Sequence, residues 1–273
     1  MKENNWFDPF YIQSHLSEEE SNIQKNVRDF CNNELKPTVV ERNRKNEFDQ
    51  RLYPKFGSLG VLGQTVKTHG GSGTSNLAYG LVAYEFEKID SSYRSSISVQ
   101  SSLVIHPINE FGSEEQKDKY LPSLIKGEKI GCFGLTESEA GSDPTSMKTS
   151  FKKTKDGYIL NGSKNWITNA PIADIFIIWA IEENKDHKSI KGFIIEKNTE
   201  GLNTSTIENK TSLKISPTGQ IILNNVFVPN NLCLENTEGW KSVFSCLNKA
   251  RFGISWGVSV SYTHLTLPTI PQV

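Results

Sequence analysis

The chain of 273 residues carries 30 Lys and Arg against 31 Asp and Glu, so its net charge is -1. This balance excludes nucleic acid as the main partner, because binding a phosphate backbone needs an excess of basic residues. Hydrophobic residues make up 36% of the chain, and no apolar run approaches the ~20 residues that span a bilayer, so we expect a globular protein without membrane insertion.

The cysteines and the first residues bear on the compartment. The four cysteines are far apart and form no CxxC pair, which favours reduced structural thiols over a disulfide framework or a metal site. Residues 1–10 are polar and aromatic and match neither a signal peptide nor an Arg-rich transit peptide. We therefore expect a bacterial cytoplasmic location, with the mitochondrial matrix as the second choice.

The first half of the chain predicts helices. Two capping boxes, Ser17 to Glu20 and Ser113 to Gln116, mark helix starts. Apolar residues recur at helical spacing behind the first of them, and Pro37 limits that helix. Further helices are expected over residues 76–90 and 93–111, the second mostly apolar and therefore buried. Residues 1–129 thus predict an N-terminal all-α domain.

From residue 130 the hydrophobic pattern changes to short β-rich runs. These runs are 158–160, 175–180, 192–196 and 221–228, with turn signals between them. No long helical pattern interrupts them, so residues 130–238 predict an antiparallel β-domain, sandwich- or barrel-like. The fold class is α+β.

A helical pattern begins again after Trp240 and is expected to open a C-terminal helical domain at residues 239–259. Residues 260–273 read as one frame of a sequencing adapter, so we interpret them as a non-native tail on a truncated chain, with a divergent natural C-terminus as the alternative.

Two segments could bind a planar ligand. Leu135 to Asp143 is rich in small and polar residues, which let backbone amides approach a ligand closely, although such loops are mostly plain turns. Trp166 lies two residues before Thr168, so a ring could stack on one while the other donates a hydrogen bond. For this tryptophan alone, a place in the core is the commoner outcome.

Two further segments could bind anions. Arg94 opens an apolar helix and needs an anion if it is buried, and Glu87 seven residues earlier could supply it as a plain structural pair. Lys249 and Arg251 could bind phosphate or carboxylate, but their spacing alone favours a solvated basic helix face.

These four segments, in this order on a helical and then a β domain, resemble the acyl-CoA dehydrogenase family over residues 6–259. The segments that carry the resemblance are L-T-E…G-S-D at 135–143 and W-I-T-N at 166–169. The runs Tyr93-Arg94-Ser95-Ser96, 98–102, 106–108 and 247–257 make it most similar to the glutaryl-CoA branch. Ser138 departs from the proline that many members carry, which is expected to loosen the loop.

The resemblance implies FAD as cofactor and an acyl-CoA as substrate. The implied flavin contacts lie in the first two segments: Phe133, Leu135, Thr136, Gly141, Ser142, Trp166, Ile167 and Thr168. Arg94, Ser95 and Glu87 would serve a distal carboxylate of the substrate, and Ser142, Phe244, Asn248 and Arg251 would line the CoA side. Electron-transfer flavoprotein is the implied partner, and a homo-oligomer is implied at full length.

The implied reaction is the oxidation of glutaryl-CoA to crotonyl-CoA with loss of CO2. The catalytic base of the family is a Glu in the C-terminal helical domain, so we assign no base here and expect this chain to be inactive. The alternatives are an enzyme for short or branched uncharged acyl chains, a non-decarboxylating enzyme, and an inactive fragment that binds flavin or CoA. No metal is expected.

Overall fold

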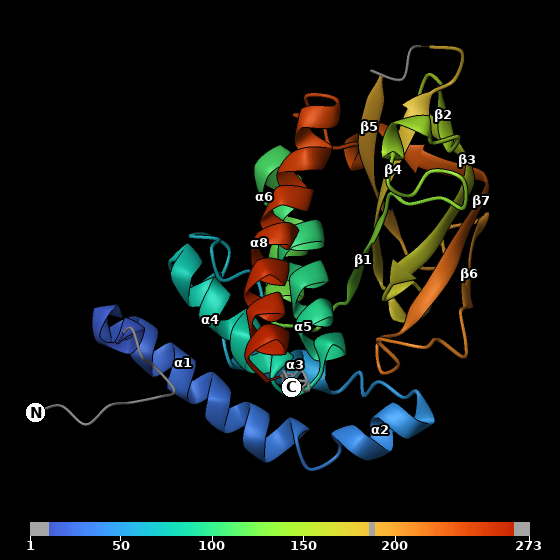
Figure 1. Cartoon of the computed structure of the whole chain (residues 1–273). Helices are drawn as coiled ribbons and strands as arrows, with labels where there is room; N and C mark the ends of the chain where they lie inside the picture. Colours follow the sequence, from blue (N-terminus) through green and yellow to red (C-terminus); the bar gives the residue numbers. More distant parts are fainter. Residues whose placement is uncertain (1–10, 186–188, 265–273) are drawn as a thin grey trace, which may run out of the picture.

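A computed structural model describes residues 11–185 and 189–264. Helices occupy one half of the molecule and a curled sheet the other, and a long helix at the end of the described chain crosses back over the helices (Figure 1). Of the expected non-native tail, residues 265–273 lie outside the described residues, and residues 260–264 form the last turn of that long helix.

The N-terminal helices start where the sequence predicts. The capping boxes at Ser17 and Ser113 are both formed, with side chain and backbone bonded reciprocally. The α-helices of this part are α1 (Glu18–Phe30), α2 (Val39–Lys45), α3 (Leu52–Ser58), α4 (Asn76–Glu87), α5 (Ser91–Ser98), α6 (His106–Phe111) and α7 (Glu114–Ile125). Single turns of 3-10 helix occur at Ile12–His15, Pro144–Ser146, Ala170–Ile172 and Asn230–Leu232.

Two segments that continue the α-helices are π-helical, which the hydrophobic pattern does not reveal. Cys31–Leu35 extends α1, and Val99–Ile105 joins α5 to α6, so that residues 91–111 form one continuous helix. Most of that π segment is buried, as expected for an apolar helix at the centre of the fold.

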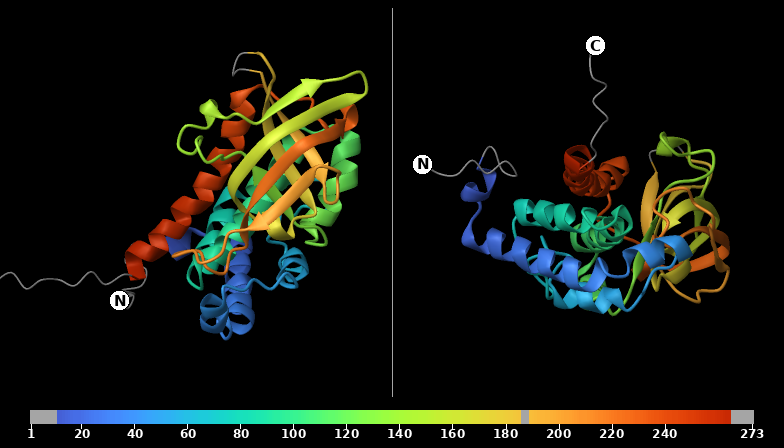
Figure 2. Two further views of the ribbon diagram at one scale, coloured as in Figure 1. Left: turned by 90° about the vertical axis from the view of Figure 1, so that its right-hand side faces the viewer. Right: turned by 60° about the horizontal axis from the view of Figure 1, so that its bottom comes forward.

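The sheet has seven strands in the order β1-β4-β2-β3-β7-β6, and β5 pairs with β4. The strands are β1 (Gly131–Gly134), β2 (Ser150–Lys153), β3 (Gly157–Thr168), β4 (Ile175–Glu182), β5 (Ile190–Glu196), β6 (Leu202–Thr206) and β7 (Thr218–Pro229). The sheet is strongly curled (Figure 2). It is not wholly antiparallel, because β4 pairs in parallel with both β1 and β2.

Two buried amides join the helices to the sheet. Gln100 donates to the carbonyls of Leu124 and Lys129 and accepts from the amide of Gly131, at 2.8 to 3.0 Å. Asn169 donates to the hydroxyl of Tyr53 at 2.7 Å and to the carbonyl of Gly131 at 3.1 Å. Buried polar groups must be paired, so these bonds fix the strand β1 against the helices.

The last described helix, α8 (Trp240–His264), packs along α4 and α5 (Figure 1). Glycines permit the close approach: a Cβ on Gly80 would lie 2.2 Å from the Trp256 ring, and one on Gly253 would lie 2.7 Å from the Tyr79 hydroxyl. None of the helices among the described residues is long and apolar enough to cross a membrane.

Candidate functional site

The loop after β1 is a tight turn. Glu137 and Ala140 exchange two backbone hydrogen bonds, at 3.1 and 3.2 Å, around the two exposed residues between them. Before the turn, Phe133 and Leu135 are buried and Thr136 is partly exposed, whereas Gly141 and Ser142 after it are exposed. The first predicted segment is therefore accessible to solvent at Thr136, at the two turn residues and again at residues 141–142.

Strand β3 is interrupted by a bulge between Lys164 and Ile167, where its register against β7 shifts. The bulge puts Trp166 at φ +60°, in the left-handed region, and leaves its side chain 58% exposed. The core position that composition alone favoured for this tryptophan is therefore wrong. Ile167 is buried, and Thr168 is partly exposed at the end of the strand.

The two predicted segments lie directly against each other. The amide of Asn165 donates to the carbonyl of Thr136 at 2.9 Å, and its side chain donates to the Ser138 hydroxyl at 3.2 Å. The Asn165 side chain also accepts from the amide of Trp166 at 3.0 Å. Ser138, whose effect on the looseness of the loop stays a prediction, thus joins the loop to the bulge.

A buried ion pair that the sequence analysis missed lies beneath this contact. Lys164 is fully buried, and its ammonium donates to Glu137 at 2.9 Å and to the carbonyl of Leu135 at 3.0 Å. Glu137 also accepts from the backbone amides of Lys148, at 2.7 Å, and Thr149, at 3.0 Å. The signal was the alternation of β3, which puts Lys164 on the inward face with Tyr158 and Leu160.

Each member of this pair shifts the pKa of the other towards its charged form. Burial lowers the pKa of Lys164 to about 8, against the opposing charge of Glu137. Burial alone would raise the pKa of Glu137, but the Lys164 charge and the hydrogen bonds from Thr149 and Lys148 outweigh it, so this pKa lies below its ordinary value.

Arg94 and Glu87 form the expected pair, with 2.7 Å between Arg94 Nε and Glu87 Oε2. Their side chains are only 12% and 7% exposed. Glu87 also accepts from the Ser91 hydroxyl, and a Cβ on Gly257 of α8 would lie 2.7 Å from its carboxylate. Ser95, next to Arg94 in α5, is partly buried.

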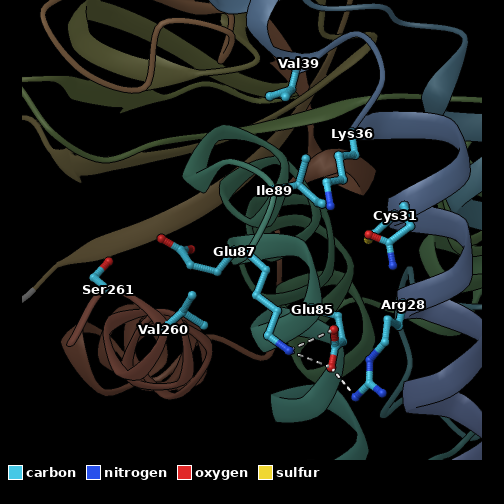
Figure 3. Close-up of a pocket in the computed structure, with 11 residues that line it drawn as sticks. Arg28, Cys31, Lys36, Val39, Glu85, Glu87, Ile89, Val260 and Ser261 are labelled. Atoms are coloured by element: carbon cyan, nitrogen blue, oxygen red, sulfur yellow. Dashed lines mark hydrogen bonds and ion pairs between the residues drawn. The ribbon is translucent and has the colours of Figure 1, made fainter. Parts of the chain in front are cut away.

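Glu85, two residues before Glu87 on α4, faces a different way from Glu87 (Figure 3). It is 2% exposed and accepts from Arg28 and Gln24 at 2.9 Å and from Lys88 at 3.3 Å. Glu85, Arg28 and Lys88, together with Glu87, line a cavity of about 700 Å³ between α1, α4 and α8. No spacing in the sequence indicated it, because its partners come from two distant helices.

The predicted α8 residues form a separate group. Asn248 and Arg251 are exposed and bonded to each other at 2.9 Å, and Phe244 is partly buried against Trp240. Among the described residues, no hydrogen bond or ion pair joins them to Ser142. The described residues also contain no cluster of His, Cys, Asp or Glu that could hold a metal ion.

Comparison with known proteins identifies the family that has this architecture. The family models "Acyl-CoA dehydrogenase, N-terminal domain" and "Acyl-CoA dehydrogenase, middle domain" match residues 17–128 and 132–226. The chain belongs to the acyl-CoA dehydrogenase family. It is 37% identical to an acyl-CoA dehydrogenase of Bacillus subtilis and 36% identical to a short-chain-specific acyl-CoA dehydrogenase of Clostridium acetobutylicum. Each alignment covers 88% of this chain and 64% of the relative.

Solved structures with a similar fold support this assignment to the family. A glutaryl-CoA dehydrogenase of Mycobacterium smegmatis in complex with FADH2 superimposes with a TM-score of 0.88 at 41% identity, over 91% of this chain and 63% of that one. Butyryl-CoA dehydrogenase of Megasphaera elsdenii gives 0.83 at 35% identity, over 89% and 65%. A chain from a structure titled electron transferring flavoprotein of Acidaminococcus fermentans gives 0.84 at 35%, over 89% and 64%. This chain thus spans just under two thirds of the length of these relatives.

Proposed function

We propose that this chain forms the FAD- and acyl-CoA-binding part of an enzyme that oxidises acyl-CoA thioesters. The observation that carries the proposal is the direct bonding of the loop 135–142 to the bulge that exposes Trp166. The two segments come from different strands, and together they offer a flat aromatic face beside polar backbone and hydroxyl groups.

The described residues fit a flavin. A large side chain that is 58% exposed on left-handed backbone costs free energy unless something covers it, and a planar ring would do so. The proposed flavin contacts are Phe133, Leu135, Thr136, Gly141, Ser142, Trp166, Ile167 and Thr168. FAD, when bound, supplies the acceptor for the hydride that leaves the β-carbon of the acyl chain.

The substrate that we favour is glutaryl-CoA, converted to crotonyl-CoA and CO2. Arg94 supports it: the side chain is 12% exposed, its Nε is bonded to Glu87, and no acceptor for its two terminal nitrogens is found among the described residues. A guanidinium so placed favours a second anion, such as the distal carboxylate of a dicarboxylic acyl chain. Ser95 and Glu87 would complete this site.

The CoA side would be lined by Ser142, Phe244, Asn248 and Arg251. We assign no catalytic base among the described residues, because Glu87, the carboxylate beside Arg94, is held by Arg94 and Ser91. We therefore propose that this chain binds its ligands without turnover. We further propose electron-transfer flavoprotein as the redox partner, homo-oligomers at full length and a bacterial cytoplasmic location, in line with the bacterial relatives.

The test compares two CoA esters by titration calorimetry with the FAD-loaded chain. We expect glutaryl-CoA to bind about tenfold or more tightly than butyryl-CoA, since a charge-assisted hydrogen bond contributes about 1.5–3 kcal/mol. Arg94→Gln should remove this preference and leave butyryl-CoA binding unchanged. Arg251→Gln should weaken both esters alike.

If Arg94→Gln leaves the ratio of the two affinities as it is in the wild type, the glutaryl proposal is wrong. A preference for butyryl-CoA in the wild type would favour the second candidate, an enzyme for short uncharged acyl chains, in line with the short-chain-specific relative.

A further inference from the structure

The Lys164–Glu137 pair connects three segments that are distant in the chain. The Lys164 ammonium, in β3, meets Leu135 O at 3.0 Å, Glu137 Oε1 at 2.9 Å and Met147 Sδ at 3.8 Å, so all three of its N–H groups have an acceptor. The Glu137 carboxylate in turn receives the amides of Lys148 and Thr149, just before β2.

The absence of a side chain at Gly134 leaves space for Lys164. A Cβ on Gly134 would lie 3.2 Å from Lys164 Cγ and 2.6 Å from Ile178 Cδ1. The aliphatic part of Lys164 therefore crosses directly over the end of β1 before its ammonium reaches the loop. The end of β1 and the loop after it therefore both contact the Lys164 side chain.

The hydrogen bond from Lys164 to the loop is followed, one residue later, by a hydrogen bond from Asn165 in the bulge. Lys164 holds the carbonyl of Leu135, and the next residue, Asn165, holds the carbonyl of Thr136 at 2.9 Å. The residue after that is Trp166, turned outward at φ +60°. Two successive hydrogen bonds, from Lys164 and Asn165, therefore join residues 135–136 to β3 directly before the exposed Trp166.

The free energy of unfolding alone does not require an ion pair at this position. Replacing a buried ion pair by apolar side chains of similar size is often neutral or stabilising, because both charges lose their hydration on burial. An ionic pair, however, fixes direction and distance where apolar side chains would slide. The Lys164 ammonium also polarises the Leu135–Thr136 peptide, which makes the Thr136 amide a stronger hydrogen-bond donor.

We propose that Lys164 and Glu137 are positioning residues, which hold the Leu135–Thr136 peptide in register with Trp166 so that both present one preformed face to the flavin ring. This inference rests on the proposed flavin site. It assigns the two residues no contact with the flavin; they act through the backbone that they hold.

The test uses a double variant, Lys164→Met with Glu137→Leu, which removes both charges and leaves none unpaired. The chain offers a matched control, because Lys148, just before β2, and Glu139, in the same loop as Glu137, form an exposed ion pair, with side chains 76% and 73% exposed. The control variant is Lys148→Met with Glu139→Leu. All proteins are compared without flavin and during titration with FAD.

Without flavin, we expect the double variant to keep the far-UV circular dichroism of the wild type and to melt at a lower temperature, because the amides of Lys148 and Thr149 and the carbonyl of Leu135 lose their partners. Hydrogen exchange of the Asn165 amide should become about tenfold faster or more, because its acceptor on Thr136 is no longer held. With FAD, affinity should fall about tenfold or more, and the visible flavin band should lose its resolved shoulders. The control should match the wild type throughout.

Wild-type exchange at Asn165 together with wild-type FAD affinity and spectrum in the double variant would overturn the proposal. If the double variant does not fold, Lys164→Met alone replaces it, since it removes the bond to the Leu135 carbonyl and leaves Glu137 bonded to the amides of Lys148 and Thr149. A wild-type exchange rate and flavin spectrum in that variant would equally overturn the proposal. If the wild-type chain binds no FAD, the proposed function fails instead, while the exchange of Asn165 still tests the positioning role.

Discussion

Trp166 combines a strained backbone conformation with an exposed side chain in the proposed flavin site. An L-residue in left-handed backbone costs about 1–2 kcal/mol, and the exposed side chain recovers little of this by packing. Trp166→Gly should therefore leave the free energy of unfolding of the flavin-free chain within about 0.5 kcal/mol of the wild type, because relief of strain offsets the added freedom of the unfolded chain.

The same variant should weaken FAD binding by about tenfold or more, since the stacking surface is lost. Urea unfolding and flavin titration measure the two effects. Asn225→Gly is the control, because Asn225 is also left-handed and exposed, at φ +52°. A loss of stability without a loss of FAD affinity would mean that Trp166 is structural.

The residue types of this site could be predicted from the sequence, but its geometry could not. The small-residue loop and the W-I-T-N run are visible as patterns, whereas the bulge that exposes Trp166 depends on the register between β3 and β7. A one-residue slip reverses which face of a strand is buried. Lys164 was missed for the related reason that a charged residue in a strand is expected to face solvent.

Among the elements, those with local signals could be predicted. The helices that start at Glu18 and Glu114 follow their capping boxes, which need only four consecutive residues. Strands β2 and β6 were missed because S-F-K-K and L-N-T-S-T are short and polar, and pairing with neighbours rather than propensity makes them strands. The domain boundaries at 129/130 and 238/239 stay predictions.

One point of contact between α4 and α8 depends on the missing side chain of Gly80. A Cβ on Gly80 would lie 2.2 Å from the Trp256 ring, so Gly80→Ala should destabilise the chain by about 1–3 kcal/mol through overpacking. Adding Trp256→Leu should recover part of that loss, and a double-mutant cycle in urea measures the coupling. Strictly additive effects would contradict this account of the contact.

The junction between α6 and α8 should make stability depend on pH. Burial and the nearby charge of Lys249 lower the pKa of His106 from 6.5 to about 4, while Glu110 acts in the opposite sense. The unfolded chain therefore takes up this proton first, so stability is lost as the pH falls from about 6.5 towards 4. The loss should reach about 2 kcal/mol.

His106→Gln should flatten this part of the pH dependence, because glutamine can still bond the Ser245 hydroxyl, which lies 3.1 Å from His106 Nε2, and does not titrate. Urea unfolding at pH 7 and pH 4.5 compares the two proteins. An equal loss in both would assign the acid sensitivity to other groups.

On the scale of the whole molecule, one apolar cluster extends across helices and sheet, and a second lies within the β part, between residues 132 and 233. The largest apolar cluster contains Leu35 and Phe86 from the helices together with Ile177 and Ile194 from the sheet. Composition and the change of period at residue 130 predict two structural types, but they do not reveal that the larger cluster is shared by both. We therefore expect helices and sheet to unfold in a single transition.

Gln100 gives the means to test this cooperativity. Its fully buried amide pairs three backbone groups where α7 passes into β1. Gln100→Met should lower the free energy of unfolding by about 3 kcal/mol, because each of those buried groups loses its partner. Gln220→Met, at an exposed position of β7, should cost less than about 0.5 kcal/mol. Far-UV circular dichroism and tryptophan fluorescence should report the same midpoint in all three proteins; separate midpoints in the wild type would show that the helical and β parts unfold independently.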